Sequence, residues 1–500
     1  MKKKIIITLL ACTLIFSSVG YLTANYTYYG LGIITLLLLV IAIENTIQKR
    51  HSILRNYPIL GIPRWILEEL RDKIRQYFID SDTDEVPFSR EQRSIVYQRS
   101  KGDAETVPFG TIHNVYEEGH EYIAHKNIRT KPGEIKDRFL IGSKHCDLKY
   151  SSSIMNISDM SWGSLSGAAI RALNLGAKKG GFLHSTGEGG VSSHHLQGGD
   201  LCFQIGTGYF GAGKTVDGQR VFCEKAFLKS ISHPSVKMVE IKLSQGAKPG
   251  HGGMLPAVKN TKDIAKVRGV EAYTDVYSPG YHSAFSDIRG MVEFIQKLRS
   301  LSGGKPIGIK LCMGDPRELH NMCREFKRMD NYPDYISIDG SEGGTGSAPY
   351  EFTNFVGTPL MYALREVDSS LRLNDLRDEI KVFASGKVSN AFDIIRLLAM
   401  GADGVKVARS FMLSLGCIQA RICNTDKCPV GVATQNKNLE SGLIVEDKYK
   451  RVFNYHNRTI EEVKKIAAIA GVTNLNKINK RSIYRIVDGV PKSLHEIYKT

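Results

Sequence analysis

Residues 380–413 read IKVFASGKVSNAFDIIRLLAMGADGVKVARSFML, and they contain one complete strand–helix–strand unit. The run IKVFASG ends in a glycine turn, NAFDIIRLLAMGA has apolar residues at helical spacing, and GVKVARS is again a short apolar run. A buried strand, an amphipathic helix and a second buried strand in this order indicate parallel strands joined by a crossover helix. This stretch therefore predicts an α/β fold.

The same pattern extends outward from this unit, from about residue 148 to about residue 410. Eight short apolar runs end in turns rich in Gly or Ser, and helical stretches such as 167–180 and 287–301 separate them. The runs are SSIMNISDM, FLHST, CFQIGTG, VKMVEIKL, PIGIKLC, YISIDG, IKVFASG and GVKVARS. Eight strand–helix repeats in about 260 residues predict a (β/α)8 (TIM) barrel. A doubly wound sheet is the alternative, but no GxGxxG fingerprint opens any of the units.

Composition narrows the functional class. The chain has 500 residues, a formal net charge of +16 and nine cysteines. No zinc-finger, RNP or basic-helix signature accompanies the positive charge, so we expect no nucleic-acid partner and assign the charge mostly to a solvated face near lipid. An odd number of cysteines without regular disulfide spacing is typical of a reducing compartment.

Two charge-free apolar runs, residues 5–23 and 28–43, begin the chain. Each is about as long as a membrane-spanning helix. Only ANYT separates them, and the flanks are basic, with Lys2, Lys3, Lys4, Lys49, Arg50 and Arg55. By the positive-inside rule we expect a transmembrane hairpin with both ends, and hence the catalytic domain, in the cytoplasm. A cleaved signal, or a lipoprotein signal ending at Cys12, is the rival interpretation, and the second apolar run argues against it.

A cysteine cluster follows the last strand-like run, in GCIQARICNTDKCPVGVATQ, residues 416–435. Its members are Cys417, Cys423 and Cys428. Zinc or a [4Fe–4S] cluster would require a fourth ligand, for which Cys312 or Cys323 would have to be recruited. Three thiolates are sufficient for a [3Fe–4S] cluster. The remaining alternative is three buried cysteines without a metal.

These patterns divide the chain into four parts. We expect a transmembrane hairpin at 1–50, an amphipathic helix and extension at 51–147, the barrel at 148–416, and an iron–sulfur loop with a helical tail at 417–500. Within the extension, 57–80 predicts an amphipathic helix that either lies on the bilayer or packs on the barrel, and GTIHNVYE (110–117) resembles a strand. In the tail, TIEEVKKIAAIAG and RSIYRIV both read as helical.

Polar and glycine-rich residues follow the predicted strands at the catalytic end of a barrel. The loops ASGKVSN (384–390) and VARSFML (407–413) lie where barrels bind phosphate, with Gly386 and either Lys387 or Arg409 as contacts. An ordinary strand–helix turn is the plainer interpretation of each loop. DGSEGGTGSAP (339–349) suits a flat ring or phosphate pressed against backbone.

The other polar positions indicate substrate chemistry. In VEIKLSQGAKPGHGGMLP (239–256), Lys242, Gln245 and Lys248 suit a dicarboxylate, although a lysine more often extends to solvent. Glu188, between glycines in STGEGG, can handle ammonium or a proton. Within strand-like runs, Gln204 and Lys310 are expected to point into the barrel mouth, where a lysine can stabilise negative charge on a reduced flavin.

Taken together, five segments resemble the FMN-binding synthase domain of glutamate synthase. They are SDMSWGSLSGAAIRAL, STGEGG, EIKLSQGAKPGHGG, DGSEGGTGSAP and GCIQARICNTDKCPVGVATQ, in the family's order between about 148 and 435. The hairpin and the short length resemble the stand-alone, membrane-anchored large-subunit-like proteins of bacteria.

The resemblance implies a reaction and its residues. Ammonia would condense with 2-oxoglutarate to 2-iminoglutarate, and reduced FMN would deliver hydride to give L-glutamate. A [3Fe–4S] cluster on the three clustered cysteines would pass electrons to the flavin. Lys242 and Glu188 would be catalytic, Glu188 on the ammonia route, and Lys242, Gln245 and Lys248 would hold the oxo acid. FMN contacts would be Ser158, Gln204, Lys310, Gly343, Gly344, Thr345, Ser385, Gly386, Ala408 and Arg409.

Three departures from the family pattern qualify this implication. The sequence begins with MKKK and a hairpin in place of a glutaminase domain, so ammonia would arrive free or from a separate glutaminase. No dinucleotide-binding module is visible, so ferredoxin or a reductase subunit would donate electrons. His251 stands in KPGHGG where the family has Glu. An enzyme for another amine, as in N-methylglutamate synthesis, or for another oxo acid is the first alternative. A binding protein without catalysis is the second.

Overall fold

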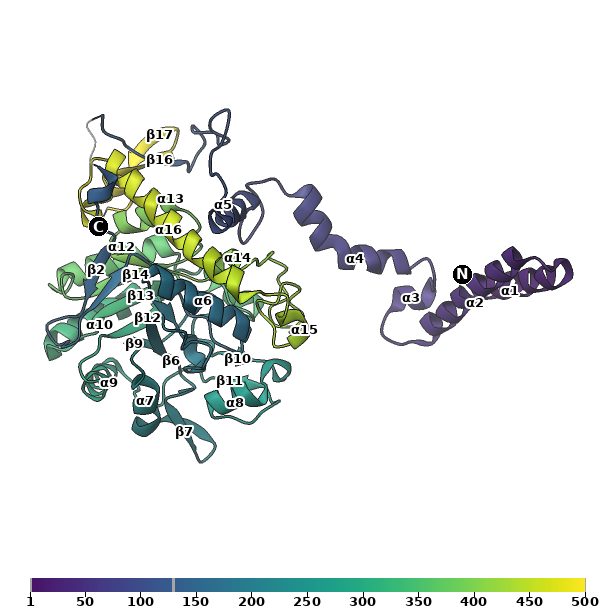
Figure 1. The fold of residues 1–500 in the computed structure, drawn as a ribbon, viewed down its shortest axis with the longest axis horizontal. Coiled ribbons are helices and arrows are strands. Elements are labelled where there is room, and N and C mark those ends of the chain that lie inside the picture. The colour runs from purple at the N-terminus through teal and green to yellow at the C-terminus, as the bar shows by residue number, and fades with distance from the viewer. Residues whose placement is uncertain (1, 128–130, 500) are drawn as a thin grey trace. The chain divides into compact units, whose positions relative to one another are not determined.

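The computed structural model describes residues 2–127 and 131–499. The chain forms two compact units, Met1–Arg90 and Glu91–Thr500 (Figure 1).

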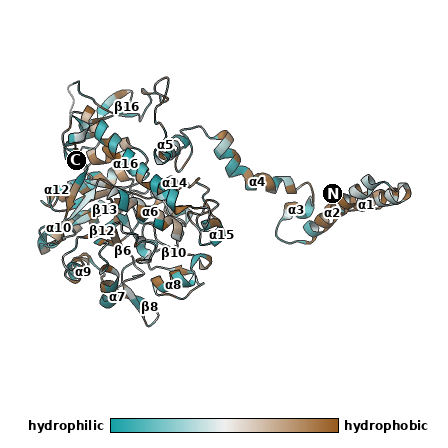
Figure 2. Ribbon diagram, viewed as in Figure 1, coloured by the Kyte–Doolittle hydropathy of each residue, from teal (hydrophilic) through white to brown (hydrophobic). Residues whose placement is uncertain are grey.

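The first unit begins with two long apolar helices, α1 (Lys2–Thr23) and α2 (Tyr26–Ile47), which pack side by side. The Asn25 side chain accepts a hydrogen bond from Thr27 N and caps α2. Both helices are long and apolar enough to cross a membrane, a test that a signal sequence near an N-terminus also passes. The two predicted helices are therefore confirmed as helices, and Figure 2 shows their hydrophobic character.

The rest of this unit is a short helix and a longer amphipathic one. They are α3 (Ser52–Asn56) and α4 (Ile62–Ile74), which continues into the π-helical turn η1 (Arg75–Ile79). The helix predicted within 57–80 is confirmed. Pro63 lies in its first turn, where a missing backbone N–H costs nothing.

The second unit is built on a closed barrel of eight strands, and each neighbouring pair is parallel. The strands are β4 (Met155–Ile157), β5 (His184–Ser185), β6 (Leu201–Ile205), β9 (Val236–Lys242), β12 (Ile307–Cys312), β13 (Tyr335–Asp339), β14 (Lys381–Ser385) and β15 (Gly404–Val407). Seven of the eight predicted runs contain one of these strands, and the run CFQIGTG covers β6 except its first residue, Leu201. The (β/α)8 prediction is confirmed.

Helices follow the strands around the barrel. They are α6 (Gly167–Gly180), α7 (Glu224–Ile231), α8 (Lys262–Arg268), α9 (Ile288–Leu301), α10 (Pro316–Met329), α11 (Tyr350–Phe355), α12 (Leu360–Leu373), α13 (Ala391–Ala399) and α14 (Arg409–Ser414). Local sequence sets their ends. Ser166 caps α6, whose last turn closes on the left-handed Gly181, and Asn390 forms a capping box with Asp393 at the start of α13.

A hairpin closes the amino end of the barrel. It consists of β2 (Arg138–Ile141) and β3 (Tyr150–Ser153), which pair antiparallel. Ile141 and Tyr150 from this hairpin join buried Leu183, Cys202, Met238, Tyr335 and Phe383 from the barrel in one apolar cluster. The barrel interior is thus filled and apolar at this end. We therefore expect a ligand to bind at the opposite, carboxyl end of the strands.

The C-terminal tail departs partly from its predicted structure. The long helix α16 (Val445–Ile469) packs across α6, α13 and α14, as a helical tail requires. Residues 481–487 were predicted as helix, and this is wrong: β16 (Ile483–Val487) pairs with β1 (Glu121–Ile123). The strand predicted at 110–117 is also wrong, because 110–117 is a loop with turns. Tyr122 stacks on Tyr484 across the β1–β16 pair, a tertiary contact that overrides the local pattern.

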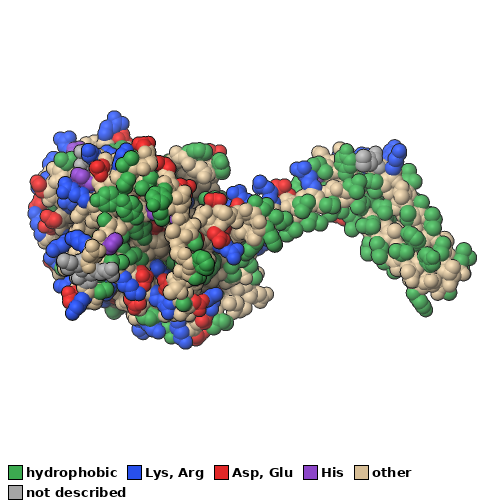
Figure 3. All heavy atoms as spheres, turned by 90° about the horizontal axis from the view of Figure 1, so that it is seen from above, with side chains coloured by type: hydrophobic (Ala, Val, Ile, Leu, Met, Phe, Trp, Pro, Cys, Tyr) green, Lys and Arg blue, Asp and Glu red, His purple; other side chains and the backbone are tan. Residues whose placement is uncertain are grey.

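Smaller elements complete the second unit. They are α5 (Arg90–Lys101), β7 (Gly213–Val216), β8 (Gln219–Phe222), β10 (Met254–Leu255), β11 (Val276–Tyr277), α15 (Lys437–Glu440), β17 (Val490–Ser493), α17 (Leu494–Ile497) and the 3₁₀ turns at Pro132–Glu134, Gly187–Gly189, Ala257–Lys259 and Leu475–Lys477. Figure 3 shows basic and acidic side chains interspersed over the face of the second unit that it presents.

Candidate active site at the barrel mouth

A buried ion triad lies at the carboxyl end of the barrel. Lys310 on β12 forms ion pairs with Asp159, just after β4, and with Asp339 at the end of β13, where Nζ and Oδ2 are 3.0 Å apart. Burial opposes the charged forms, but the mutual attraction is stronger. It therefore holds the pKa of Asp159 below and the pKa of Lys310 above the ordinary value. Asp159 and Asp339 were not singled out by sequence, because only the closed barrel brings them to Lys310.

A second polar layer surrounds Glu240 on β9. Its carboxylate pairs with Lys406 on β15 and accepts hydrogen bonds from Gln204 Nε2 at 2.9 Å and Ser337 Oγ at 2.6 Å. Gln204 Oε1 and Asp339 Oδ1 are buried and have no hydrogen-bond partner among residues 2–127 and 131–499. Buried acceptors of this kind require a donor from outside the protein. Together with the Lys310 ammonium they fit a polar, planar ligand at the mouth.

The two loops predicted to bind phosphate bring cations together. Arg409 begins α14, and its guanidinium donates to Glu342 O at 2.7 Å. Burial lowers the pKa of Arg409 to about 10. Burial and the neighbouring Arg409 charge also lower the pKa of Lys387. Two desolvated cations side by side favour a bound anion, so this corner fits a phosphate.

Backbone contacts place the remaining residues predicted to bind the cofactor. Gly343 N donates to Gly340 O at 2.9 Å, and Ser158 N donates to Val407 O at 2.9 Å, across the β4–β15 junction. A Cβ on Gly344 would lie 2.9 Å from Arg409 Cδ, so this glycine leaves room for the arginine. The others lie at strand or loop ends around the same mouth: Thr345 is exposed after β13, Ser385 ends β14, Gly386 follows it, and Ala408 caps α14.

Glu342 is a feature of this corner that sequence reasoning missed. Its carboxylate accepts hydrogen bonds from Leu360 N at 3.1 and 3.3 Å, and it lies beside Gly386. Its position in the Gly-rich loop 339–349 was a signal, since a lone acidic residue among glycines seldom serves as spacer.

A small hollow next to the triad is lined by Lys242 and Gln245, two of the three predicted substrate residues, and by Glu188. Its lining includes Glu188, Thr207, Lys242, Ser244, Gln245, Gly250, His251, Gly252, Gly253, Pro279 and Gly280. Lys242 Nζ and Glu188 Oε1 are 2.9 Å apart. Burial alone would raise the pKa of Glu188, but the Lys242 charge outweighs it and lowers that pKa. Lys248 is buried within electrostatic reach of the same pair, and burial and Lys242 lower its pKa.

Glycines shape the space around Glu188. Any side chain at Gly206 or Gly253 would collide with the Glu188 carboxylate. The carboxylate is thus held in place between two backbones that approach closely.

Two further buried groups support the hollow and were not expected from sequence. Arg268 donates to Ser161 Oγ at 3.2 Å, and its pKa falls to about 10 through burial, opposed by the charge of Glu188. His282 Nε2 lies 2.9 Å from Lys242 O. Their sequence surroundings carry no motif, so only the fold reveals them.

The three clustered cysteines follow α14 in one loop. Burial, together with the neighbouring Cys423 and Cys428 thiols, raises the pKa of the Cys417 thiol to about 12. The three sulfurs are therefore electrostatically coupled neighbours. Among the described residues, no three His, Cys, Asp or Glu side chains are close enough to hold a single metal ion. Cys312 lies in β12 and Cys323 in α10, outside this loop.

Two side chains from distant segments hold the cysteine loop. Lys259 is 2% exposed, and its Nζ donates to Ser164 O at 2.7 Å, Cys423 O at 3.1 Å and Ala433 O at 3.2 Å. Tyr97 on α5 donates to Cys417 O at 2.6 Å. The Lys259 ammonium lies within electrostatic reach of the Cys423 and Cys428 sulfurs, so it can partly balance negative charge on them. No pattern in the sequence predicts the contact of Lys259 or of Tyr97 with this loop.

Comparisons with known proteins identify the family of this chain. The family model described as a conserved region in glutamate synthase matches residues 116–473. A glutamate synthase large subunit-like protein YerD of Bacillus subtilis (strain 168) is 36% identical over 92% of this chain and 95% of its own length. The archaeal glutamate synthase [NADPH] of Methanocaldococcus jannaschii is 32% identical over 66% of this chain and 61% of its own. The chain thus spans about three fifths of that enzyme.

Solved structures resemble the fold only distantly. A flavocytochrome b2 with sulfite bound has a TM-score of 0.45 and 14% identity, covering 84% of this chain and 85% of that chain. A mandelate oxidase with benzoyl-formic acid has a TM-score of 0.43 and 12% identity, covering 80% and 90%. The family assignment depends on the sequence matches instead: the chain belongs to the glutamate synthase family, whose enzymes are oxidoreductases.

Proposed function

We propose that this chain catalyses the reductive amination of 2-oxoglutarate to L-glutamate through 2-iminoglutarate, with ammonia as the nitrogen donor. The hollow that joins Lys242, Gln245 and Glu188 is the observation that supports this most. An ammonium and an amide can hold the carboxylate and oxo groups of a dicarboxylate. A carboxylate beside them can take a proton from ammonium.

The order of proton transfers follows from these groups. Glu188 accepts a proton from ammonium, and the ammonia formed attacks C2 of the oxo acid. Lys242 can protonate the C2 oxygen, which leaves as water and gives the imine. A hydride at C2 and a proton at nitrogen complete the reaction. In balance, one oxo acid, one ammonium, two electrons and two protons give glutamate and water.

FMN is the proposed source of the hydride. The triad around Lys310 and the orphaned Gln204 acceptor would face its ring system, and Ser385, Gly386, Ala408 and Arg409 would hold its phosphate. Gly343, Gly344, Thr345 and Ser158 would supply the close backbone approach.

Cys417, Cys423 and Cys428 would hold a [3Fe–4S] cluster, which supplies one-electron transfer to the flavin. The electrostatic coupling of the Cys417 thiol to the Cys423 and Cys428 thiols in one loop supports this placement. Electrons would come from a partner, either ferredoxin or a reductase subunit, and a separate glutaminase could deliver ammonia.

The apolar helices α1 and α2 would anchor the chain in a membrane as a hairpin. The basic residues that flank them support an orientation with the catalytic unit in the cytoplasm.

Anaerobically purified full-length protein tests this function. We expect flavin absorption, about three irons per chain, and glutamate formation from 2-oxoglutarate and ammonium with a chemical reductant. A colourless protein that contains zinc would contradict the proposal.

A second candidate changes the amine. His251 lines the hollow where the resemblance predicts Glu, and its ring packs against Phe352. The imidazole lacks the negative charge expected there, and with the Phe352 ring it offers an apolar contact to the methyl group of an alkylamine. Steady-state rates with methylamine in place of ammonium separate the two candidates.

A further inference from the structure

The amphipathic segment α4–η1, residues 62–79, is not used by the proposed reaction. Every residue of it is exposed or half-buried. The exposed apolar side chains include Leu67, Leu70 and Phe78, and Phe78 is 85% exposed. A soluble surface rarely leaves so much apolar area on one short segment without an interaction partner.

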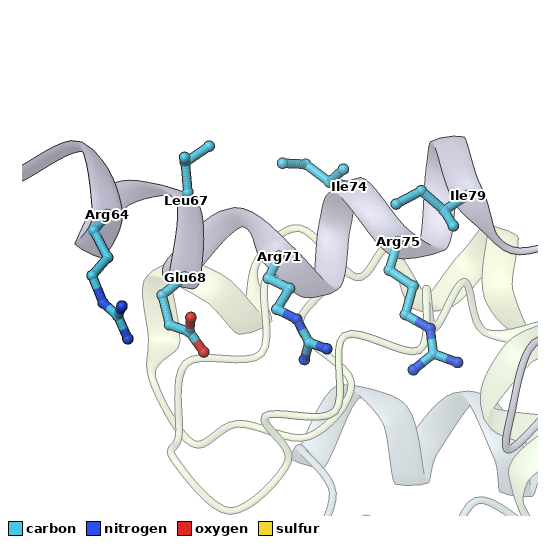
Figure 4. Close-up of a pocket in the computed structure, with 7 residues that line it drawn as sticks. All are labelled: Arg64, Leu67, Glu68, Arg71, Ile74, Arg75 and Ile79. Carbon is cyan, nitrogen blue, oxygen red and sulfur yellow. The ribbon is translucent and has the colours of Figure 1, made fainter.

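The segment has two distinct faces. Figure 4 shows Leu67 and Ile74 pointing to one side of the ribbon and the charged side chains pointing to the other. Arg64, Glu68, Arg71 and Arg75 recur at helical spacing and form the charged face. Such a division is typical of a helix that lies at a lipid–water interface.

The start of α4 is fixed close to the end of α2. Asn45, in the last turns of α2, donates from Nδ2 to Pro58 O at 2.7 Å, just before α4. A side chain at Gly61 would collide with Tyr57 O, so the turn into α4 is tight. If α2 crosses a membrane, as proposed above, α4 starts at the level where α2 leaves it.

The charge of this region suits an anionic surface. Residues 48–79 contain seven Lys or Arg and three Asp or Glu, a difference of four positive charges. Polybasic segments next to a membrane helix are attracted to anionic lipid. The long arginine side chains can reach the headgroups while the apolar face enters the acyl region.

We propose that α4–η1 is an interfacial helix that lies on an anionic lipid surface with Leu67, Leu70 and Ile74 inserted. The inference depends on the membrane anchor proposed above. The helix would then fix the point at which the chain leaves the bilayer toward the catalytic unit.

Tryptophan quenching in the full-length protein tests this placement. In a Trp65→Phe background, Leu70→Trp reports the apolar face and Glu68→Trp, on the opposite face, is the matched control. Both variants retain Trp162, so the difference between them reports the introduced indole. In phosphatidylglycerol-containing vesicles, we expect brominated lipid to reduce the Leu70→Trp signal by about half and leave Glu68→Trp nearly unchanged.

Vesicle flotation distinguishes the membrane anchor formed by α1 and α2 from the interfacial placement of α4–η1. Co-flotation without quenching of Leu70→Trp would overturn the interfacial helix and leave the anchor intact. Equal quenching of both variants would also contradict it, because an amphipathic helix must insert one face. Protein that does not float would refute the anchor and the interfacial helix together. Vesicles of pure phosphatidylcholine should give weaker quenching, and equal quenching would refute the role of anionic lipid.

Discussion

The Glu188 carboxylate has to stay ionised, and it also has to be free to accept a proton from ammonium. Its ion pair with Lys242 bears on both requirements. Lys242 keeps Glu188 ionised by lowering its pKa, and an ionised carboxylate is the form that can accept a proton from ammonium. An incoming oxo acid carries its own carboxylates and competes for Lys242. Substrate binding would therefore free Glu188 for ammonium.

Glu188→Gln removes the proton acceptor and keeps the shape. We expect kcat with ammonium near neutral pH to fall by about 100-fold, with partial recovery at alkaline pH where free ammonia becomes abundant. The pH profile of kcat, measured at saturating 2-oxoglutarate, checks this. An unchanged profile would contradict the role of Glu188, and an unchanged melting temperature controls for folding.

Lys259 should matter for the cysteine loop and not for the flavin. Lys259→Met leaves three carbonyls without their buried donor, at a cost of about 3 kcal/mol to the loop. We expect iron content to fall while flavin content is retained. Lys262→Met, at an exposed position nearby, is the control. Full iron occupancy in Lys259→Met would refute the holding role.

At the scale of elements, the phosphate corner depends on how β13, β14 and β15 end. The loop after β13 passes against Arg409, which begins α14 after β15. The phosphate corner therefore forms only when the barrel closes and brings these loops together. No single sequence motif contains it.

Gly344→Ala tests this arrangement. A methyl group at this position meets Arg409 and should displace it, so we expect FMN affinity to fall by about tenfold, or about 1.4 kcal/mol. Gly346→Ala is the matched control, because its nearest contact, Cys423 Cβ, is 3.9 Å away. Flavin fluorescence titration measures both. Equal affinities would show that Arg409 does not hold the phosphate.

Secondary-structure elements with a local sequence signal could be predicted, and those that depend on a distant partner could not. The eight strands were found because each is a short apolar run that ends in a turn, a local signal. Residues 481–487 were misassigned because IYRIV suits helix or strand, and only the partner β1 decides. The sequence did not predict Asp159, Glu342 and Arg268 as site residues, because their roles arise from contacts between distant segments.

At the scale of the whole molecule, the proposed membrane anchor and the candidate active site belong to different units. The first unit contains the apolar hairpin and α4–η1, whereas the barrel, the cysteine loop and the tail all lie in the second.

A chain that begins at residue 81 should therefore lose membrane attachment alone. We expect it to remain in the supernatant after ultracentrifugation of cell extract, and to keep flavin and iron in the same ratio as the full chain. The full chain should sediment with membranes. Sedimentation of the shortened chain in folded form would place a membrane contact in the second unit.

A single turnover of the pre-reduced enzyme tests the central claim most directly. The flavin is reduced anaerobically, and the protein is mixed with 2-oxoglutarate and ¹⁵N-ammonium while flavin absorption and products are followed. The account predicts that flavin reoxidises only when both substrates are present, with one [¹⁵N]glutamate formed per flavin. Flavin that stays reduced, or that reoxidises without labelled glutamate, would contradict it.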